Sequence, residues 1–404
     1  MKCRHCTAEL TLPLIDLGTA PPSNAYLRPE QLAAPERWFP LRVLACTRCW
    51  LAQTEDFASA DELFDADYAY FSSYSLSWLG HAERYVAAMA AALALGPHSM
   101  VVEVAANDGY LLQYVRARGI PCLGIEPTAS TAAAAEAKGL SIVRAFFGRQ
   151  LAQSLLDQGH GADLMVANNV LAHVPDINDF VAGFAVLLKP DGVATFEFPH
   201  LQSLVEGCQF DTIYHEHFSY LSLLAVDSIF ASNGLQIFDV AELPTHGGSL
   251  RVFAQRADRA VRPRNATVAA MLARERAIGM AGPAWYGTLQ LAAERIKHDL
   301  LAFLVTEKRA GRTVAGYGAA AKGNTLLNWA GVRPDLLPWV ADANPAKQGK
   351  RLPGSRILVS APERLAVERP ATVLILPWNL RDEIRALLGG GQRIAIAVPR
   401  LEVT

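Results

Sequence analysis

Hydrophobic and polar positions alternate in blocks along the middle of the chain. Short apolar runs that end in polar residues are typical of buried parallel strands. The segments between them place apolar residues at helical spacing, and one begins with Thr and Ser residues that favour helix starts. The expected strands, with the loops that follow them, lie at 100–108, 121–127, 162–174 and 193–200. This alternation predicts a doubly wound α/β sheet, in which ligands bind at the carboxyl ends of the strands.

The pattern changes after residue 200. Residues 201–280 break the alternation, helical spacing returns over 281–310, and a second α/β unit begins at 312. We therefore expect two α/β domains joined by a segment of a different kind.

The composition mainly excludes certain classes of protein. The chain has 404 residues, of which 51% are hydrophobic and 19% charged, and its formal net charge is −2. This length predicts two or three domains, and the charge argues against a protein that coats nucleic acid. No apolar run reaches the roughly 18 residues of a membrane span. The first residues lack the apolar core of a secretory signal, so we expect a cytoplasmic protein without membrane contact.

The cysteines form the most specific pattern. Four of the six occur as two C-x-x-C pairs, Cys3 with Cys6 and Cys46 with Cys49. Cytoplasmic thiols stay reduced, and two such pairs suit the closed four-sulfur geometry of structural zinc. Buried or redox cysteines are the alternative, and His5 is a competing ligand. We expect this zinc to contribute stability and to take no part in catalysis.

The turn after the strand at 100–108 carries the cofactor signal. A dinucleotide site needs G-x-G-x-x-G, whereas here only Gly109 is present, with Ala105 and Asn107 where glycines are expected. A turn with Glu103 and Asp108 instead suits a cationic ligand without phosphate, such as S-adenosylmethionine. The strand ends that follow bring further candidates, which are Glu126 for the ribose hydroxyls and Asn168 and Asn169 in "ANNVLAHV".

A set of motifs in a fixed order resembles a known family. They are "DYAYFSSYS", "VVEVAANDGYLL", "NNVLAHV", "YHEHFSYLS", "HGGSLRVF" and "GYGAAAKGNTLLN", together with the cysteine pairs. The whole chain resembles the nucleotide-sugar C-methyltransferases of deoxysugar biosynthesis and is similar to sugar C-3 methyltransferases. The resemblance implies a zinc domain, a Rossmann-like S-adenosylmethionine domain and a second Rossmann-like domain that enclose a nucleotide diphosphate sugar, expected to be a TDP-linked 4-keto sugar.

With this resemblance we divide the chain into five parts. They are a zinc-binding domain (1–60), an aromatic-rich helical connector (61–95), an S-adenosylmethionine domain (96–200), an active-site segment (201–280) and a nucleotide-sugar domain (281–404).

The stretch "YHEHFSY" raises three possibilities. It belongs to a span that holds five of the ten histidines. A metal site is one, although only His215 and His217 share a strand face, and the H-E-x-x-H spacing of zinc hydrolases is absent. A polar loop with capping histidines is the second. An acid–base cluster is the third and the one we favour, because histidine titrates near neutral pH.

The resemblance implies that Tyr-x-Glu-His is the active unit. On this chain His217 is then the base, Glu216 orients or charges its imidazole, and Tyr214 donates to the sugar or its enolate. His173 is expected near the C-4 oxygen, and the role of His215 stays open.

The tyrosine-rich segment has two interpretations. Residue type alone favours a hydrophobic contact between domains for residues 61–80. The resemblance instead places one tyrosine of this segment at the substrate, and we favour Tyr68 and Tyr70 as catalytic candidates, with Tyr74 behind them.

The remaining substrate candidates come from "THGGSLRV" and the C-terminal unit. Glycines after a strand let backbone amides approach a diphosphate at a helix start, although a tight strand–helix junction is the alternative. The candidates are His246, Gly316, Tyr317, Gly318, Lys322, Asn324 and Asp342.

Together these features predict an enzyme that methylates a carbon of a nucleotide-linked 4-keto-deoxysugar. A keto group acidifies the neighbouring C–H, so one base forms an enolate that accepts the methyl group. The alternatives are an O- or N-methyltransferase acting on a nucleotide sugar and a zinc-containing scaffold protein that senses ligands.

Overall fold

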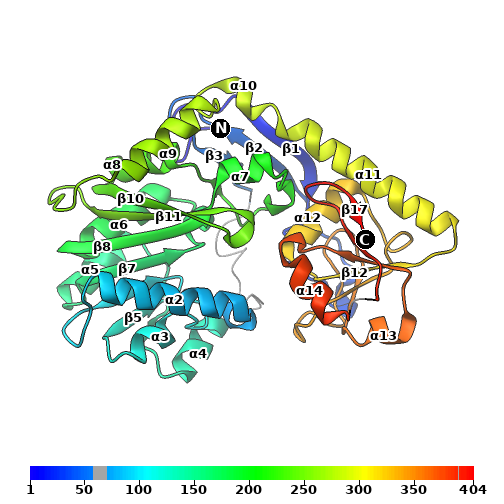
Figure 1. Cartoon of the computed structure of the whole chain (residues 1–404), viewed down its shortest axis with the longest axis horizontal. Coiled ribbons are helices and arrows are strands. Elements are labelled where there is room, and N and C mark those ends of the chain that lie inside the picture. The colour runs from blue at the N-terminus through cyan, green and yellow to red at the C-terminus, as the bar shows by residue number, and fades with distance from the viewer. Residues whose placement is uncertain (58–70, 390) are drawn as a thin grey trace.

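The apolar runs form two α/β sheets, and a smaller N-terminal sheet lies between them. The computed structural model describes residues 1–57, 71–389 and 391–404, so Tyr68 and Tyr70 lie outside the described residues. Figure 1 shows the two α/β sheets as separate lobes with the N-terminal sheet at the top between them, and helix α11 (Leu289–Arg309) running along the C-terminal lobe.

The N-terminal sheet takes its fourth strand from the middle of the chain. It is antiparallel, with the order β1 (Leu12–Ala20), β2 (Phe39–Ala45), β3 (Ala52–Thr54) and β9 (Ser219–Tyr220). A single 3-10 turn, η1 (Pro29–Gln31), lies between β1 and β2. The long connection between the two cysteine pairs therefore contains the paired strands β1 and β2, joined by a loop over residues 21–38. β9 belongs to "YHEHFSY", so this motif is attached to the zinc-binding part of the chain.

The central sheet has seven strands within the described residues. In spatial order they are β10 (Leu235–Leu243), β11 (Ser249–Arg256), β8 (Leu188–Pro199), β7 (Ala162–Asn168), β4 (Val101–Val104), β5 (Cys122–Ile125) and β6 (Ile142–Val143). β11 runs antiparallel to both of its neighbours, and the strands from β8 to β6 are parallel.

This sheet extends past residue 200, the boundary expected from the sequence. The alternation breaks there because β10 and β11 form an antiparallel hairpin, which needs no helix between its strands. The helices of this lobe are α2 (Leu76–Ala92), α3 (Leu112–Arg116), α4 (Ala129–Ala137), α5 (Arg149–Asp157), α6 (Ile177–Leu187), α7 (Leu201–Glu206), α8 (Leu223–Ser232) and α9 (Ala266–Ala277). Its 3-10 turns are η2 (Ser72–Tyr74), η3 (Leu171–His173), η4 (Phe210–Thr212) and η5 (Thr245–Gly247).

The C-terminal sheet confirms the second α/β unit. Its order is β14 (Leu358–Ser360), β13 (Trp339–Ala341), β12 (Val314–Tyr317), β15 (Thr372–Ile375), β16 (Ile394–Ile396) and β17 (Glu402–Val403), parallel except for β17. Its helices, besides α11, are α10 (Pro283–Tyr286), α12 (Ala321–Ala330), α13 (Arg364–Glu368), η6 (Trp378–Leu380) and α14 (Arg381–Leu387).

The N-terminal part contributes to the hydrophobic cores of both lobes. Cys46 and Leu51 are fully buried in the same cluster as the central sheet. Val43 is buried in the cluster that includes the C-terminal core, with Leu326 and Val340. Burying such a side chain stabilises a fold by roughly 1.5–3 kcal/mol. The N-terminal sheet therefore joins the two lobes through apolar contacts on each side.

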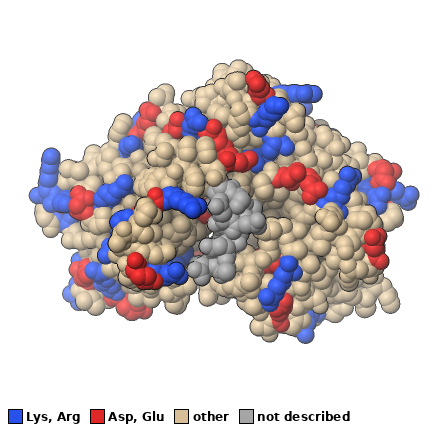
Figure 2. All heavy atoms as spheres, turned by 180° about the vertical axis from the view of Figure 1, so that it is seen from behind, with Lys and Arg blue, Asp and Glu red and all other residues tan. Residues whose placement is uncertain are grey.

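The surface mixes charges of both signs. On the face shown in Figure 2, basic and acidic side chains lie next to one another. No helix among the described residues is long and apolar enough to cross a membrane.

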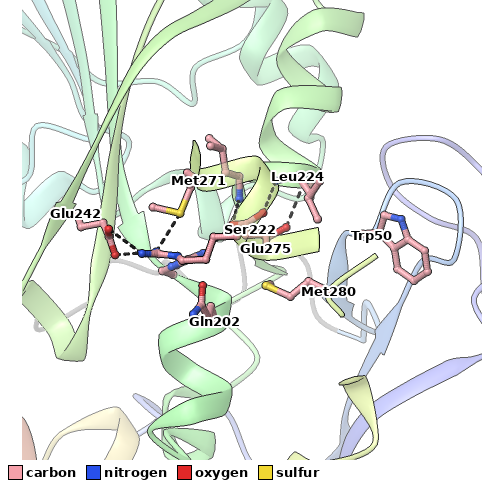
Figure 3. Close-up of polar contacts among 12 residues, drawn as sticks. Trp50, Gln202, Ser222, Leu224, Glu242, Met271, Glu275 and Met280 are labelled. Atoms are coloured by element: carbon pink, nitrogen blue, oxygen red, sulfur yellow. Dashed lines mark hydrogen bonds and ion pairs between the residues drawn. The ribbon is translucent and has the colours of Figure 1, made fainter. Parts of the chain in front are cut away.

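A buried glutamate connects three helices behind the central sheet. Glu275 in α9 is fully buried, and its carboxylate accepts hydrogen bonds from the backbone N–H groups of Leu223 and Leu224, each at 2.7 Å. These groups open α8, where the helix dipole favours a negative charge. His200 Nε2 lies 2.7 Å from Glu275 Oε1. Figure 3 shows Glu275 pointing to the start of α8 beside Ser222 and Leu224, and His200 thus has a structural role.

Replacing Glu275 by Gln should destabilise the protein by about 2–4 kcal/mol. The amide keeps the shape of the side chain but turns its own N–H group toward a backbone N–H donor. Removing one partner of a buried polar pair in this way costs stability. Urea unfolding followed by circular dichroism measures the change. Glu242→Gln is the matched control, because Glu242 pairs with Arg274 at 2.7 Å on the surface, where such pairs contribute under about 1 kcal/mol. Equal effects of the two substitutions would contradict the role given to Glu275.

Candidate active site

The two C-x-x-C pairs meet at one point. The four sulfur atoms of Cys3, Cys6, Cys46 and Cys49 lie within 4.8 Å of one another. Each pair sits on a tight turn, closed by hydrogen bonds from Cys3 N to Ala8 O (2.7 Å) and from Cys46 N to Leu51 O (2.9 Å). Four converging thiols fit the closed tetrahedral geometry of structural zinc.

Further contacts favour thiolates at this site. Gln53 Nε2 donates to Cys3 Sγ at 3.3 Å, and the backbone N–H of Arg48 donates to Cys46 Sγ at 3.4 Å. His5 turns away, since its Nδ1 lies 2.8 Å from Asn178 Oδ1 on α6. The histidine between the first two cysteines therefore joins the two domains and is no ligand.

The turn after β4 obtains its shape without a glycine fingerprint. Ala105, Asn107 and Gly109 all have positive φ, at 58°, 49° and 76°. Such angles cost an alanine free energy and suit asparagine better, so the surrounding contacts must hold them in place. A Cβ on Gly109 would come within 2.3 Å of Leu140 Cδ1, so only this position requires glycine for space.

Glu126 joins the ends of β4 and β5. Its Oε2 accepts from Asn107 N at 2.9 Å, and its Oε1 accepts from Thr128 N at 2.9 Å and from Thr131 Oγ1 at 3.0 Å. The carboxylate therefore helps to hold the left-handed turn. Glu126 lies where the sequence predicts an acid that binds the ribose. Its Oε2 accepts a single hydrogen bond from the described residues.

Several buried polar atoms converge at the same sheet edge. Both side-chain polar atoms of Asn168, at the end of β7, and Oδ1 of Asp108 make no hydrogen bond of ordinary geometry within the described residues. Buried polar atoms are rarely left so, and a bound ligand would satisfy them. Glu103 lies at the end of β4 with 1% exposure, and burial raises its pKa well above the ordinary value. Burial thus favours the neutral form of this carboxyl.

The residues before α2 lie over this turn. The backbone N–H groups of Ser72 and Ser73 donate to Asn107 Oδ1 (2.9 Å) and Asp108 Oδ2 (3.2 Å). Trp78, in the first turn of α2, stacks on Tyr110 with ring centroids 5.8 Å apart. The chain that follows the tyrosine-rich segment therefore covers the expected cofactor site, whereas Tyr74 is 69% exposed.

His217 is held in the form of a base. Its Nδ1 lies 2.8 Å from the carbonyl oxygen of Thr212, so Nδ1 carries the proton and Nε2 presents its lone pair. Burial lowers the pKa of His217 well below 6.5, and the neighbouring His173 adds to this effect. The ring is therefore neutral near pH 7. Tyr214 and His173 flank it, with ring centroids 4.0 and 4.5 Å from its own.

His173 comes to this site from the end of the central sheet. Its Nδ1 lies 2.8 Å from the backbone oxygen of Glu216 and therefore donates to it. Burial lowers the pKa of His173 to about 4, so this ring is also neutral. The two histidines predicted from separate motifs are thus neighbours.

The expected contact between Glu216 and the His217 ring is not made. The motif forms a turn here, in which His217 N donates to Tyr214 O at 2.9 Å, and the carboxylate of Glu216 accepts from Asn24 Nδ2 at 3.2 Å instead. Burial raises the pKa of Glu216 to about 7. Thr212 takes the orienting role through its backbone oxygen. Sequence reasoning missed both partners, because any residue supplies a carbonyl and Asn24 lies 192 residues away.

His246 and His215 have different surroundings. His246 Nε2 lies 3.2 Å from Asn169 Nδ2, and burial lowers its pKa to about 4. The glycines after it serve packing, since a Cβ on Gly247 would lie 2.6 Å from Trp378 Cη2. His215 instead faces the N-terminal sheet, where its Nε2 lies 3.2 Å from the carbonyl oxygen of Pro40.

The glycines of the C-terminal motif mainly allow close packing. A Cβ would meet Val340 at 2.6 Å from Gly316, Pro377 at 2.4 Å from Gly318 and Leu376 at 2.8 Å from Gly323. In the turn after β12, Ala319 N donates to Asp342 Oδ2 at 2.7 Å. These contacts agree with a tight strand–helix junction, the alternative considered from the sequence. Tyr317 is buried in the strand itself, and Asn324 Nδ2 donates to Ser23 O at 2.6 Å.

Lys322 is the residue of this motif that faces the histidines. Its Nζ donates to Asn379 Oδ1 at 2.8 Å and lies 4.9 Å from the ring centre of Trp378. Burial lowers the pKa of Lys322, and its charge helps to lower the pKa values of His217 and His246. The site thus combines groups from the central sheet, the "YHEHFSY" segment and the C-terminal domain.

Three family models match consecutive parts of the chain. A zinc binding domain matches residues 3–64, a methyltransferase domain matches residues 78–240, and a C-methyltransferase C-terminal domain matches residues 244–399. These matches agree with the cysteine cluster and with both α/β sheets. Together with the full-length relative described next, they show that the chain belongs to the C-methyltransferase family, whose cofactors here are S-adenosylmethionine and zinc.

The chain is similar along its whole length to C-methyltransferase NovU of Streptomyces niveus. The identity is 35% over 408 residues, covering 100% of this chain and 96% of that protein. The resemblance to C-methyltransferases seen in the motifs is thereby confirmed.

Among solved structures, magnesium protoporphyrin IX methyltransferase of Synechocystis has 17% identity and a TM-score of 0.35, covering 44% of this chain and 83% of that one. The PH0226 protein of Pyrococcus horikoshii has 10% identity and a TM-score of 0.37, covering 46% and 95%. Likeness at this level carries no information about the methyl acceptor.

Purified protein should contain about one zinc per chain. Cys46→Ser should abolish retention of the metal and lower the thermal midpoint by several degrees, because structural zinc contributes directly to folding. Elemental analysis and thermal unfolding measure the two effects. Cys122→Ser is the control, since Cys122 lies on β5 outside the cluster. Zinc retained at the wild-type level in Cys46→Ser would refute the four-sulfur site.

Glu216→Gln should stabilise the protein at high pH. The pKa of Glu216 rises from an ordinary 4.5 to about 7 on folding. Between these two pH values the folded state therefore keeps a proton that the unfolded state has released. The wild type should therefore lose about 3 kcal/mol relative to the variant as pH rises from about 4.5 to about 7.

Unfolding at pH 4.5 and pH 8 measures this gap. Glu136→Gln provides a control of opposite sign, because Arg144 lowers the pKa of Glu136 on the surface. A gap for Glu216→Gln that is the same at both pH values would contradict the buried, proton-holding carboxyl.

Proposed function

We propose that this protein methylates C-3 of a nucleotide-linked 4-keto-deoxysugar through an enolate, with His217 as the base. The observation that carries the proposal is the neutral His217 ring, whose Nδ1–H is held by Thr212 O and whose Nε2 is the basic atom. The similarity to a C-methyltransferase supports transfer to carbon.

Each step falls to a named group. His217 Nε2 removes the proton from the carbon next to the keto group. The resulting enolate oxygen needs a donor, and Tyr214 supplies an O–H. Bound S-adenosylmethionine supplies an electrophilic methyl group, which the enolate carbon accepts. Because Nδ1 of His173 already donates to Glu216 O, its Nε2 accepts a hydrogen bond, and we assign it to a sugar hydroxyl rather than to the C-4 oxygen.

The cofactor and nucleotide contacts complete the proposal. The atoms of Asp108 and Asn168 that lack ordinary hydrogen bonds support binding of the amino-acid end of the cofactor, with Glu126 at the ribose. Lys322 and the first turn of α12 are proposed to face the diphosphate, since a helix start favours an anion. Of the further candidates, Asp342 and His246 stay proposals, as do Tyr68 and Tyr70, one of which would contact the sugar.

The proposed location is the cytoplasm. All six cysteines are free thiols, which suits a reducing compartment and a zinc site. The sugar's nucleotide is proposed to be TDP.

The proposed reaction can be tested with a panel of nucleotide-linked 4-keto-deoxysugars. Product mass and the position of a labelled methyl group by NMR identify the acceptor atom. Exchange of the C-3 hydrogen with deuterated solvent reports the base step alone, and an O- or N-methyltransferase would show no such exchange.

His217→Gln should lower both turnover and hydrogen exchange by about 100-fold or more, because a positioned base contributes 10²–10⁴-fold. Its affinity for S-adenosylmethionine, measured by calorimetry, should stay near the wild-type value. His298→Gln, on the exposed side of α11, is the control and should retain full activity. Near wild-type exchange in a folded His217→Gln protein would remove His217 as the base.

A further inference from the structure

The base is followed directly by a strand of the N-terminal sheet. β9 begins two residues after His217 and pairs with β3, with Ser219 opposite Gln53 and Tyr220 opposite Ala52. The pairing continues toward the base, because Thr54 N donates to Phe218 O at 3.2 Å.

Thr54 extends this contact to the base itself. Its hydroxyl donates to the backbone oxygen of His217 at 3.0 Å, and Thr54 is 2% exposed. One residue thus binds two consecutive carbonyl groups, those of residues 217 and 218. The backbone of His217 is held by Thr54, while its ring is held by Thr212 O.

β3 is in turn held by the cysteine site. Only two residues separate Cys49 from the start of β3, and the side chain of Gln53 donates to Cys3 Sγ at 3.3 Å. Arg4 adds two contacts, since its backbone N donates to Gln53 Oε1 at 2.9 Å and its Nη2 donates to Thr54 O at 3.0 Å. A continuous set of short contacts therefore leads from the thiols to the base.

We propose that Thr54 is a positioning residue for the base, through which the zinc-binding sheet holds His217 at the reacting carbon. This inference rests on the proposed function of His217. Loss of one hydrogen bond has a modest effect on stability and leaves the protein folded, whereas a shift of about 1 Å in a reacting group costs about 100-fold in rate. Loss of the Thr54 hydroxyl should therefore affect rate far more than stability.

The test compares Thr54→Val, which has the same shape without the hydroxyl, with Thr54→Ser, which keeps it. Thr54→Val should lower kcat and C-3 hydrogen exchange by about tenfold or more. Zinc content and the affinity for S-adenosylmethionine should stay within about twofold of wild type. Thr54→Ser should recover most of the rate. Thr306→Val is the matched control, since the Thr306 hydroxyl also donates to a backbone oxygen, that of Ala302 at 2.7 Å, on an exposed helix.

Two results would overturn the role of Thr54. One is a rate of C-3 hydrogen exchange in Thr54→Val that equals the wild-type rate. The other is a loss of zinc or cofactor affinity in proportion to the loss of rate, which would indicate general destabilisation.

A spectroscopic measurement keeps this inference separate from the proposed substrate. In ¹⁵N-histidine protein, the Nδ1–H signal of His217, identified by its absence in His217→Gln, should weaken through solvent exchange in Thr54→Val and persist in Thr54→Ser. An unchanged signal in Thr54→Val would refute positioning. If wild type exchanged no hydrogen with any 4-keto sugar, the proposed function would fail while this measurement still decided the role of Thr54.

Discussion

Burial of its ionisable side chains determines the charge state of the candidate site. Burial lowers the pKa values of His173, His217 and His246 and raises those of Glu103 and Glu216. Every one of these shifts favours the neutral form. A site with few fixed charges suits the proposed enolate, because weak screening strengthens the interaction of each aligned dipole with a developing negative charge. The low net charge of the site is thus a consequence of this packing.

That packing depends on contributions from distant parts of the chain. Asn24 comes from the N-terminal loop, His173 from the central sheet and Lys322 from the C-terminal domain. No single domain holds the complete set. The strand pairing that joins β9 to β3 gives the middle segment a fixed place relative to the other two parts, because a two-residue strand has little stability by itself.

The sequence predicted the features that follow local rules. The cysteine pairs, the two α/β units and the polar residues near strand ends, Glu103 and Asn168, were found by spacing and periodicity. The boundary at residue 200 differed, because a hairpin that completes a parallel sheet has no α/β signature. The partners of the histidines were out of reach for another reason. Thr212 acts through a carbonyl that every residue has, and Thr54 is far from His217 in the chain. Gly316 and Gly318 were ambiguous for a different reason. Close packing and the close approach of a ligand both require glycine, so the residue type alone does not distinguish the two roles.

The turn after β4 bears on how relatives of this protein can be recognised. Its shape resides in the backbone angles of Ala105 and Asn107, and only Gly109 lacks room for a side chain. Glycine at the first two positions would be sterically acceptable, so the conformation does not itself dictate the residue type there, although the Asn107 side chain also accepts from Ser72 N. A search keyed to a glycine fingerprint would overlook such chains, whereas one that scores the conformation of the turn, together with the acid at the next strand end, would collect them.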